Sequence, residues 1–140
     1  MKILLACICI GVALIKGTIN THAEETQIFL YQETDVVGTN VWLLPVSRAE
    51  QSPMWKDRRD APPLSLTNAI QIADKWVIAK RGGAGDLEDI YIRAIDMESG
   101  WKYRNIYFYR IRFAVGTYGN HITCIVLMDG TVVEPQHKAE

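Results

Sequence analysis

The sequence predicts an α+β protein, in which one amphipathic helix packs on an antiparallel β-meander of about four strands, with one or two extra N-terminal strands. Apolar residues repeat every three or four positions over residues 66–80, the spacing of a helix with one buried face. Apolar and polar residues then alternate, most regularly over residues 103–115, as in a strand with one buried face. A length of 140 residues, with 49% hydrophobic and 22% charged residues, fits one globular domain.

Residues 1–23 have the pattern of a secretory signal peptide. Lys2 precedes the apolar run Ile3–Ile15, which is shorter than the about 20 residues that a transmembrane helix needs. Thr21 and Ala23 supply the small residues that a signal peptidase reads. We therefore expect cleavage after Ala23, a secreted or periplasmic location, and no stable membrane span once the signal is removed.

Cleavage at this position removes Cys7 and Cys9 and leaves Cys124. A lipoprotein signal ending at Cys7 is the alternative, but too few residues precede Cys7 for a charged and an apolar segment. An exported chain with one cysteine forms no internal disulfide. Cys124 lies in the apolar run TCIVLM, which favours a buried, inert thiol over a reactive one or an intermolecular bridge.

Residues 24–63 are expected to form N-terminal strands and a loop. Alternation predicts strands over residues 26–32 and residues 40–46, and Pro45 confines the second strand to a sheet edge or ends it. Residues 47–63 contain three prolines and the charge run KDRRD, so they are interpreted as a loop that crosses the surface.

Two features of this loop are candidates for function. Trp55 is either a lid over the core or an exposed anchor for a partner. The run KDRRD, residues 56–60, could dock an acidic partner, but its mixed charges largely cancel within a Debye length. A solvated connector is the favoured interpretation of that run.

Helix signals begin at Ser65, a good N-cap residue that follows two prolines. The apolar positions continue to Lys80, and Gly82 and Gly83 provide the stop. The predicted helix is therefore Leu66–Lys80. The glycines do not form a phosphate loop, because they follow a helix, whereas a phosphate loop precedes one.

Residues 64–135 are expected to hold this helix and the antiparallel sheet. One face of the longest strand carries Tyr107, Tyr109 and Phe113, so we expect this face to lie on a core and the other face to be wet. The other predicted strands span residues 89–95, 122–128 and 131–134, with a turn at 116–121, a stop at Pro135 and a fraying tail at 136–140.

Asp129 and Gly130 lie between two β-rich runs in IVLMDGTVVEP. An Asp-Gly pair is a strong hairpin signal, because a type I′ turn requires positive φ at both central positions. A general acid or base normally needs a titratable partner nearby, and the sequence places none beside Asp129. We interpret Asp129 as a turn residue and not as a catalytic carboxylate.

No catalytic or metal-binding pattern is found in the sequence. In the chain that remains after cleavage, His121 and His137 share no ligand spacing, and paired cysteines, an acidic calcium loop and a nucleophile motif are all absent. The net charge of the whole chain is −1, and cleavage removes Lys2 and Lys16, so a nucleic-acid partner is not suggested. We expect no enzyme activity, no cofactor and no metal.

Arginines alternate along the polar face of the longest predicted strand. If Arg93 on the neighbouring strand is in register with them, the sheet presents a basic surface that could recognise an acidic partner. The alternative is a solvated face whose arginines pair with Glu88, Asp96 or Glu98 across the strands. The candidate binding residues are Arg93, Arg104, Arg110, Arg112 and Trp55.

The order of a helix and then antiparallel strands after an exported leader resembles the PepSY and cystatin-like α+β group. The resemblance rests on LSLTNAIQIADKWV, YFYRIRFAV and IVLMDGTVVEP and covers about residues 64–135. It implies a non-catalytic secreted or envelope module, of the kind found in protease propeptides and proposed to restrain peptidases, without catalytic residues or cofactors.

Two functions are compatible with these observations. The first is a non-catalytic module that binds an extracytoplasmic protein or peptidase through its sheet face, the loop at Trp55 or an exposed edge strand. The second is a cone-shaped fold with a pocket between helix and sheet for a small apolar ligand, or for acid/base chemistry by Tyr107, Tyr109 or Asp96. A core filled by aromatic side chains would argue against such a pocket.

Overall fold

The computed structural model describes residues 25–35, 37–99, 102–116 and 120–138, and the side chains of residues 97–99 and 102–104 are not described. The predicted signal peptide, residues 1–23, lies outside this part of the chain, as do Cys7 and Cys9. None of the described helices is long and apolar enough to cross a membrane.

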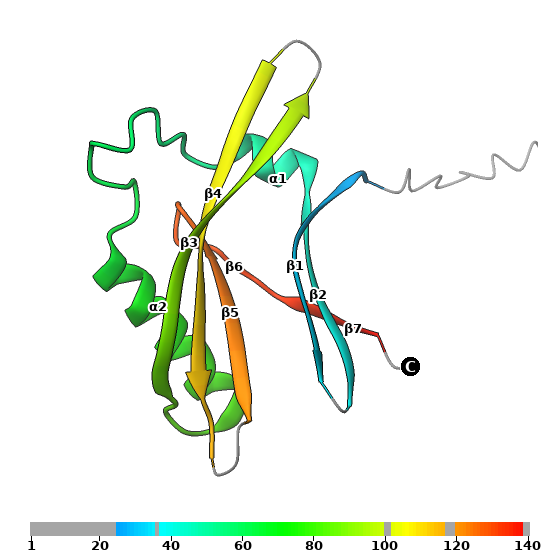
Figure 1. The fold of residues 1–140 in the computed structure, drawn as a ribbon, viewed down its shortest axis with the longest axis vertical. Coiled ribbons are helices and arrows are strands. Elements are labelled where there is room, and N and C mark those ends of the chain that lie inside the picture. The colour runs from blue at the N-terminus through cyan, green and yellow to red at the C-terminus, as the bar shows by residue number, and fades with distance from the viewer. Residues whose placement is uncertain (1–24, 36, 100–101, 117–119, 139–140) are drawn as a thin grey trace, which may run out of the picture.

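The described chain is α+β and contains two antiparallel sheets (Figure 1). One sheet has the order β3-β4-β5-β6, and the other has the order β1-β2-β7. The helices α1 and α2 precede the larger sheet in sequence. The elements are β1 Gln27–Asp35, β2 Gly38–Pro45, α1 Val46–Gln51, α2 Leu66–Arg81, β3 Asp86–Ser99, β4 Lys102–Ala114, β5 His121–Leu127, β6 Val132–Val133 and β7 Pro135–Lys138.

The helix α2 forms as its sequence signals predict. The Ser65 side chain accepts a hydrogen bond from the backbone N–H of Asn68 at 3.2 Å, and this satisfies one of the free donors of the first turn. At the other end, Gly82 has φ of 74°, a left-handed conformation that glycine adopts without steric cost. Its backbone N–H donates to the carbonyl of Ile78 at 2.7 Å and closes the helix.

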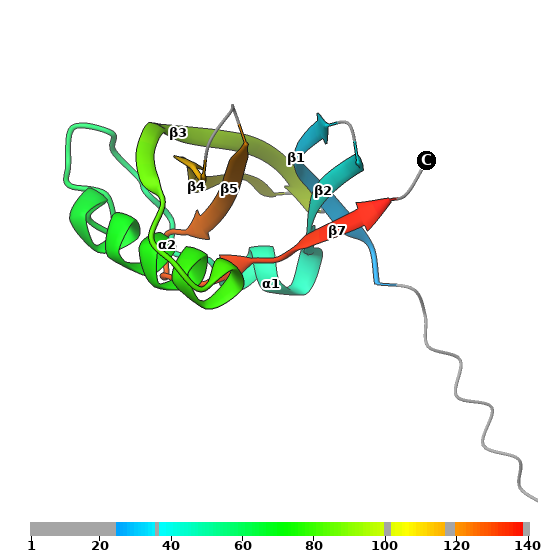
Figure 2. The same ribbon diagram turned by 90° about the horizontal axis from the view of Figure 1, so that it is seen from below.

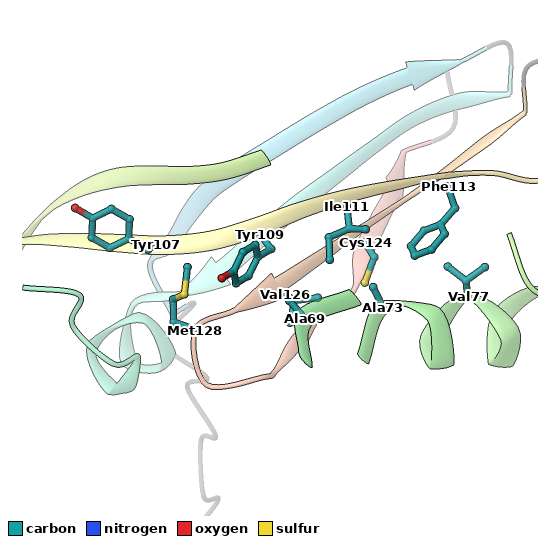
Figure 3. Packing of buried hydrophobic residues seen from close by; sticks show 10 residues of the cluster. All are labelled: Ala69, Ala73, Val77, Tyr107, Tyr109, Ile111, Phe113, Cys124, Val126 and Met128. Atoms are coloured by element: carbon teal, nitrogen blue, oxygen red, sulfur yellow. The ribbon is translucent and has the colours of Figure 1, made fainter. Parts of the chain in front are cut away.

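A core between α2 and the larger sheet holds the two elements together (Figure 3). The helix contributes three small side chains that are fully buried, Ala69, Ala73 and Val77, so its backbone can approach the sheet closely. Aromatic and aliphatic side chains of β4 and β5 fill the space above them. The buried sheet residues of this core are Tyr107, Tyr109, Ile111, Phe113, Cys124, Val126 and Met128.

A second core lies between the two sheets, and it corrects the prediction of a wet sheet face. Ile106 and Phe108 point away from α2, and both are 1% exposed because the β1–β2 hairpin covers them. Figures 1 and 2 show the smaller sheet and α2 on different sides of the larger sheet. The alternating pattern marked the apolar face correctly, but it did not show that another segment covers the opposite face. The residues of this core are Leu30, Trp42, Leu44, Ala49, Ile106, Phe108, Ile125, Leu127 and Val133.

The predicted tail is also corrected, because residues 135–138 form β7. This strand crosses from the end of β6 to β2, where it pairs from Trp42↔Pro135 to Thr39↔Lys138 (Figure 1). His137 belongs to this strand, and its Nδ1 lies 3.2 Å from Oδ1 of Asn40. The sequence PQHK shows no alternation of apolar residues, so only its main-chain pairing with β2 identifies it as a strand.

The predicted loop over residues 47–63 is wrong at its start, where residues 46–51 form α1. This helix has six residues and buries only Ala49. One buried position cannot produce the repeat of apolar residues that predicts a helix from sequence. The remainder of the segment, up to Ser65, is irregular as predicted.

The hairpin at Asp129 is confirmed, but its turn differs from the predicted two-residue type. The backbone N–H of Leu127 donates to the carbonyl of Thr131 at 2.8 Å, which leaves three residues in the loop. Gly130 has φ of 86°, as expected for the last residue of a three-residue hairpin loop. The turn therefore requires glycine at position 130, whereas the side chain of Asp129 can form contacts with other residues.

Replacing Trp42 with alanine tests whether the two sheets share one core. Trp42 is 2% exposed between the sheets, so we expect Trp42→Ala to lower the free energy of unfolding by about 3–5 kcal/mol. Urea denaturation followed by circular dichroism measures this change. Phe29→Ala is the control, because Phe29 lies on the adjacent strand and is 53% exposed. Equal, small effects of both substitutions would contradict a shared core.

Candidate functional site

Arg110 and Arg112 lie on the face of β4 that the smaller sheet partly covers. Nη2 of Arg112 is 2.8 Å from Oδ2 of Asp89, and its Nε is 3.0 Å from Oε2 of Glu88. The guanidinium of Arg110 lies over two rings, 4.4 Å from the centre of Tyr91 and 5.0 Å from the centre of Tyr31. These two predicted binding residues are therefore neutralised or stacked within the fold.

The register of the sheet explains this arginine–carboxylate cluster. Asp89 is directly opposite Arg112 in the β3–β4 pair, so the two side chains share a face. A bulge between Leu87 and Asp89 interrupts the pairing there, and Glu88 also reaches Arg112. His121 at the start of β5 adds a fifth member, with its Nδ1 2.9 Å from Oε2 of Glu88. Of the partners that the sequence suggested, Glu88 lies beside these arginines, whereas the side chain of Glu98 is outside the described part of the structure.

The other two predicted arginines are placed differently. Arg93 is opposite Phe108 on the same face as Arg110 and Arg112, and its guanidinium lies 5.6 Å from the ring centre of Tyr91. It is exposed and has no ion pair with a described carboxylate. Arg104 is opposite Met97 in the β3–β4 pair, but its side chain is among those that are not described.

Trp55 lines a hollow on the other face of this sheet, next to the outer strand β3. The hollow has a volume of about 330 Å³ and is open to solvent. Trp55 packs edge-to-face on Tyr107 with ring centres 5.3 Å apart, and its Nε1 donates to the carbonyl of Asp60 at 3.1 Å. Trp55 is thus both a lid on Tyr107 and a wall of the hollow. We call this site the Trp55 hollow, and its lining residues are Trp55, Arg58, Ile92, Arg93, Ala94 and Tyr107.

Arg58 provides a cation beside the two aromatic rings of the Trp55 hollow. Its guanidinium lies 5.4 Å from the ring centre of Tyr107, and its Nε is 3.4 Å from the Tyr107 hydroxyl. The hydrogen bond from Arg58 lowers the pKa of Tyr107 below its ordinary value, although burial acts in the opposite direction. Arg58 is not among the site residues predicted from the sequence, because the mixed charges of KDRRD do not distinguish it from its neighbours. An arginine three residues after a loop tryptophan was the available signal.

The space between α2 and the sheet is filled by side chains and not by a ligand-sized cavity in the described part of the chain. Tyr109 is fully buried, and its hydroxyl donates to the carbonyl of Leu64 at 2.7 Å. Burial raises the pKa of Tyr109, so its proton is held more firmly than that of an ordinary tyrosine. Figure 3 shows Tyr107 at the end of this core, past Tyr109 and away from α2. Asp96 is exposed near Tyr107.

Two further groups can be assigned structural positions. Cys124 is a free cysteine that is fully buried, and burial raises the pKa of its thiol to about 12. The thiolate, which is the reactive form, is therefore disfavoured. In the part of the chain that the structure describes, no cluster of histidine, cysteine and carboxylate side chains could hold a metal ion.

Asp129 connects the last hairpin to α1. Its Oδ1 accepts the backbone N–H of Thr131 at 2.9 Å, and its Oδ2 pairs with Nη2 of Arg48. Partial burial by itself would raise the pKa of Asp129, but Thr131 and Arg48 together lower it below its ordinary value. The carboxylate therefore serves as a structural link between two segments far apart in the sequence.

Comparison with known proteins gives no relative for this chain: no family model matches it, and neither a curated protein nor a solved structure is significantly similar.

Removing Asp89 tests the arginine–carboxylate cluster. The side chains of Asp89 and Arg110 are 19% and 13% exposed, so Asp89→Ala should lower the free energy of unfolding by about 1–3 kcal/mol. Asp57→Ala is the matched control, because Asp57 pairs with Arg59, whose side chain is 90% exposed, and we expect no measurable change. Chemical denaturation measures both variants, and equal stabilities would show that the cluster contributes nothing.

The charge of Asp129 should contribute to stability in a pH-dependent manner. Its pKa in the folded protein lies below the ordinary value of 3.8, so the unfolded chain takes up the proton first as the pH falls. The wild type should exceed Asp129→Asn in unfolding free energy at pH 7, and the difference should shrink as the pH falls below about 4. Urea denaturation between pH 7 and pH 3 measures this difference. A difference that is constant across this range would contradict the role of the charge.

Proposed function

We propose that the protein is an exported, non-catalytic binding module, which takes an extended segment of another polypeptide along the free edge of β3. The observation that carries this proposal is the position of β3 as the outer strand of its sheet. Its far edge is not paired with any other described strand. An unpaired edge presents backbone N–H and C=O groups that another chain can bind.

The middle of β3 carries only one of the features that usually protect an edge strand, the charged side chain of Arg93. Natural edges are often short or carry proline, lysine or inward-pointing charges. β3 spans 14 residues, and residues 90–95 contain neither proline nor lysine nor an acidic side chain. Tyr91 and Ile92 are each 46% exposed in this segment, so they leave apolar surface beside the free edge.

The charge pattern of β3 favours a different chain over a second copy of this one. Acidic residues lie at both ends of the strand, at positions 86, 88 and 89 and at positions 96 and 98. Antiparallel pairing of two β3 strands about their middle would place the acidic ends of the two copies opposite each other. Like charges directly opposite are destabilising, so self-pairing is disfavoured.

The predicted signal peptide and the resemblance to PepSY-like modules support an extracytoplasmic partner. In this proposal the partner is an envelope or secreted protein, with a peptidase as the leading candidate, and the module restrains or recruits it by strand addition. Binding of this kind requires no catalytic group, cofactor or metal.

Selection from a library of random linear peptides tests the proposal with a defined ligand pool. Peptides that bind the purified protein should slow hydrogen exchange of backbone amides in β3, because strand addition satisfies them. Ile92→Lys should abolish this binding, because it places a charge against the added strand. Ile78→Lys is the matched control, since Ile78 lies on α2 and is 42% exposed.

Three results would count against the proposal. They are a selection that yields no binding peptide, bound peptides that protect amides outside β3, and an Ile92→Lys variant that binds as tightly as Ile78→Lys. Sedimentation equilibrium is run in parallel. A dimer whose β3 amides are protected would show that a second copy of this chain, and not a peptide, pairs with β3.

A further inference from the structure

We propose that the Trp55 hollow receives an acidic side chain from the segment that pairs with β3. This inference rests on the proposed function and adds the chemistry of the recognised residue. The sequence suggested Arg110 and Arg112 for recognition of an acid, but both have partners within the fold. The acid-binding residue proposed here is Arg58, which forms no ion pair with any described carboxylate.

The position of the hollow follows from the rules of strand pairing. Residues directly opposite each other in an antiparallel pair project to the same face of the sheet. Ala94 is opposite Tyr107, and both line the hollow. A partner residue opposite Ile92 or Ala94 would therefore project its side chain over the hollow. Its volume of about 330 Å³ is at the small end of ligand sites, which suits a side chain of an added strand.

The lining of the hollow matches a glutamate or aspartate side chain. Trp55, Ile92 and Ala94 offer apolar contact for methylene groups. Arg58 offers a planar set of donors, and among the described residues its hydrogen bond is the long one from Nε to the Tyr107 hydroxyl. Guanidinium groups bind carboxylates with paired hydrogen bonds, so the remaining donors of Arg58 suit an incoming acid.

Arg59, the next residue, has the carboxylate partner that Arg58 lacks among the described residues. It forms hydrogen bonds from Nε and Nη2 to the Asp57 carboxylate, at 3.0 Å and 2.6 Å from Oδ2. Arg58 and Arg59 are adjacent and both exposed, yet only Arg59 has a carboxylate partner in the described chain. Arg58 is therefore the arginine available to an incoming acid, and substitution of Arg59 is the control for substitution of Arg58.

Asp96 is an opposing charge close enough to act on Tyr107. It acts on Tyr107 electrostatically in the direction opposite to Arg58. An acid in the hollow would be attracted by Arg58 and repelled by Asp96. Removing the charge of Asp96 should therefore strengthen binding of an acidic peptide, whereas removing the charge of Arg58 should weaken it.

The test uses a β3-binding peptide from the selection above, with each position in turn carrying Glu or Gln. At the position over the hollow, Glu should bind about tenfold more tightly than Gln, the effect of one charged hydrogen-bonded pair near the surface. Arg58→Gln should reduce this preference, although Arg93 also lines the hollow, whereas Arg59→Gln should keep it and Asp96→Asn should increase it. Fluorescence polarisation gives the dissociation constants, and thermal unfolding checks that each variant folds.

The outcomes separate this inference from the proposed function. If peptides protect β3 but no position prefers Glu, or if Arg58→Gln and Arg59→Gln have the same effect, the acid site is wrong and strand addition stands. A preference for Gln or an apolar residue at the peptide position that lies over the hollow would also show that the acid site is wrong. If no peptide protects β3, both proposals fail.

Discussion

The structure depends on the burial of one sheet on both of its faces. Successive residues of β4 point to opposite sides, so Tyr109 and Ile111 pack toward α2 while Ile106 and Phe108 pack toward the β1–β2 hairpin. The strand β5 is buried without interruption from Thr123 to Leu127 for the same reason. The two cores therefore share the backbone of β4 and β5.

The face toward the hairpin changes character along β4, from Ile106 and Phe108 to Arg110 and Arg112. The apolar part supports the smaller sheet, and the charged part is closed by Tyr31 and by the carboxylates of β3. Charged side chains in such a position need partners, because an unpaired charge away from water is strongly destabilising. The same sheet thus uses arginine as a structural residue on one face, whereas on the other face Arg58, contributed by a loop, has no carboxylate partner among the residues that the structure describes.

Local signals in the sequence were sufficient for most elements. Ser65 and Gly82 marked the ends of α2 to within one residue, and the Asp129–Gly130 pair marked the last hairpin. What could not be predicted depends on contacts between distant segments. Nothing in PQHK indicates that β2 will pair with it, and alternation in β4 cannot reveal a second layer over its polar face. For the same reason, the sequence did not indicate which arginine of KDRRD lacks a carboxylate partner among the described residues. Asp57 pairs with Arg59 and not with Arg58, and this choice is visible only in three dimensions.

The crossing of β7 to β2 also sets an order of events for a chain made from its N-terminus. The β1–β2 hairpin is synthesised early, but its third strand ends at Lys138, near the end of the sequence. At about 5–20 residues per second, the hairpin waits roughly 5–20 seconds for that strand. A two-stranded hairpin is marginally stable in water, and Trp42 cannot be enclosed until the larger sheet arrives. The smaller sheet is therefore completed only after the larger sheet has been synthesised.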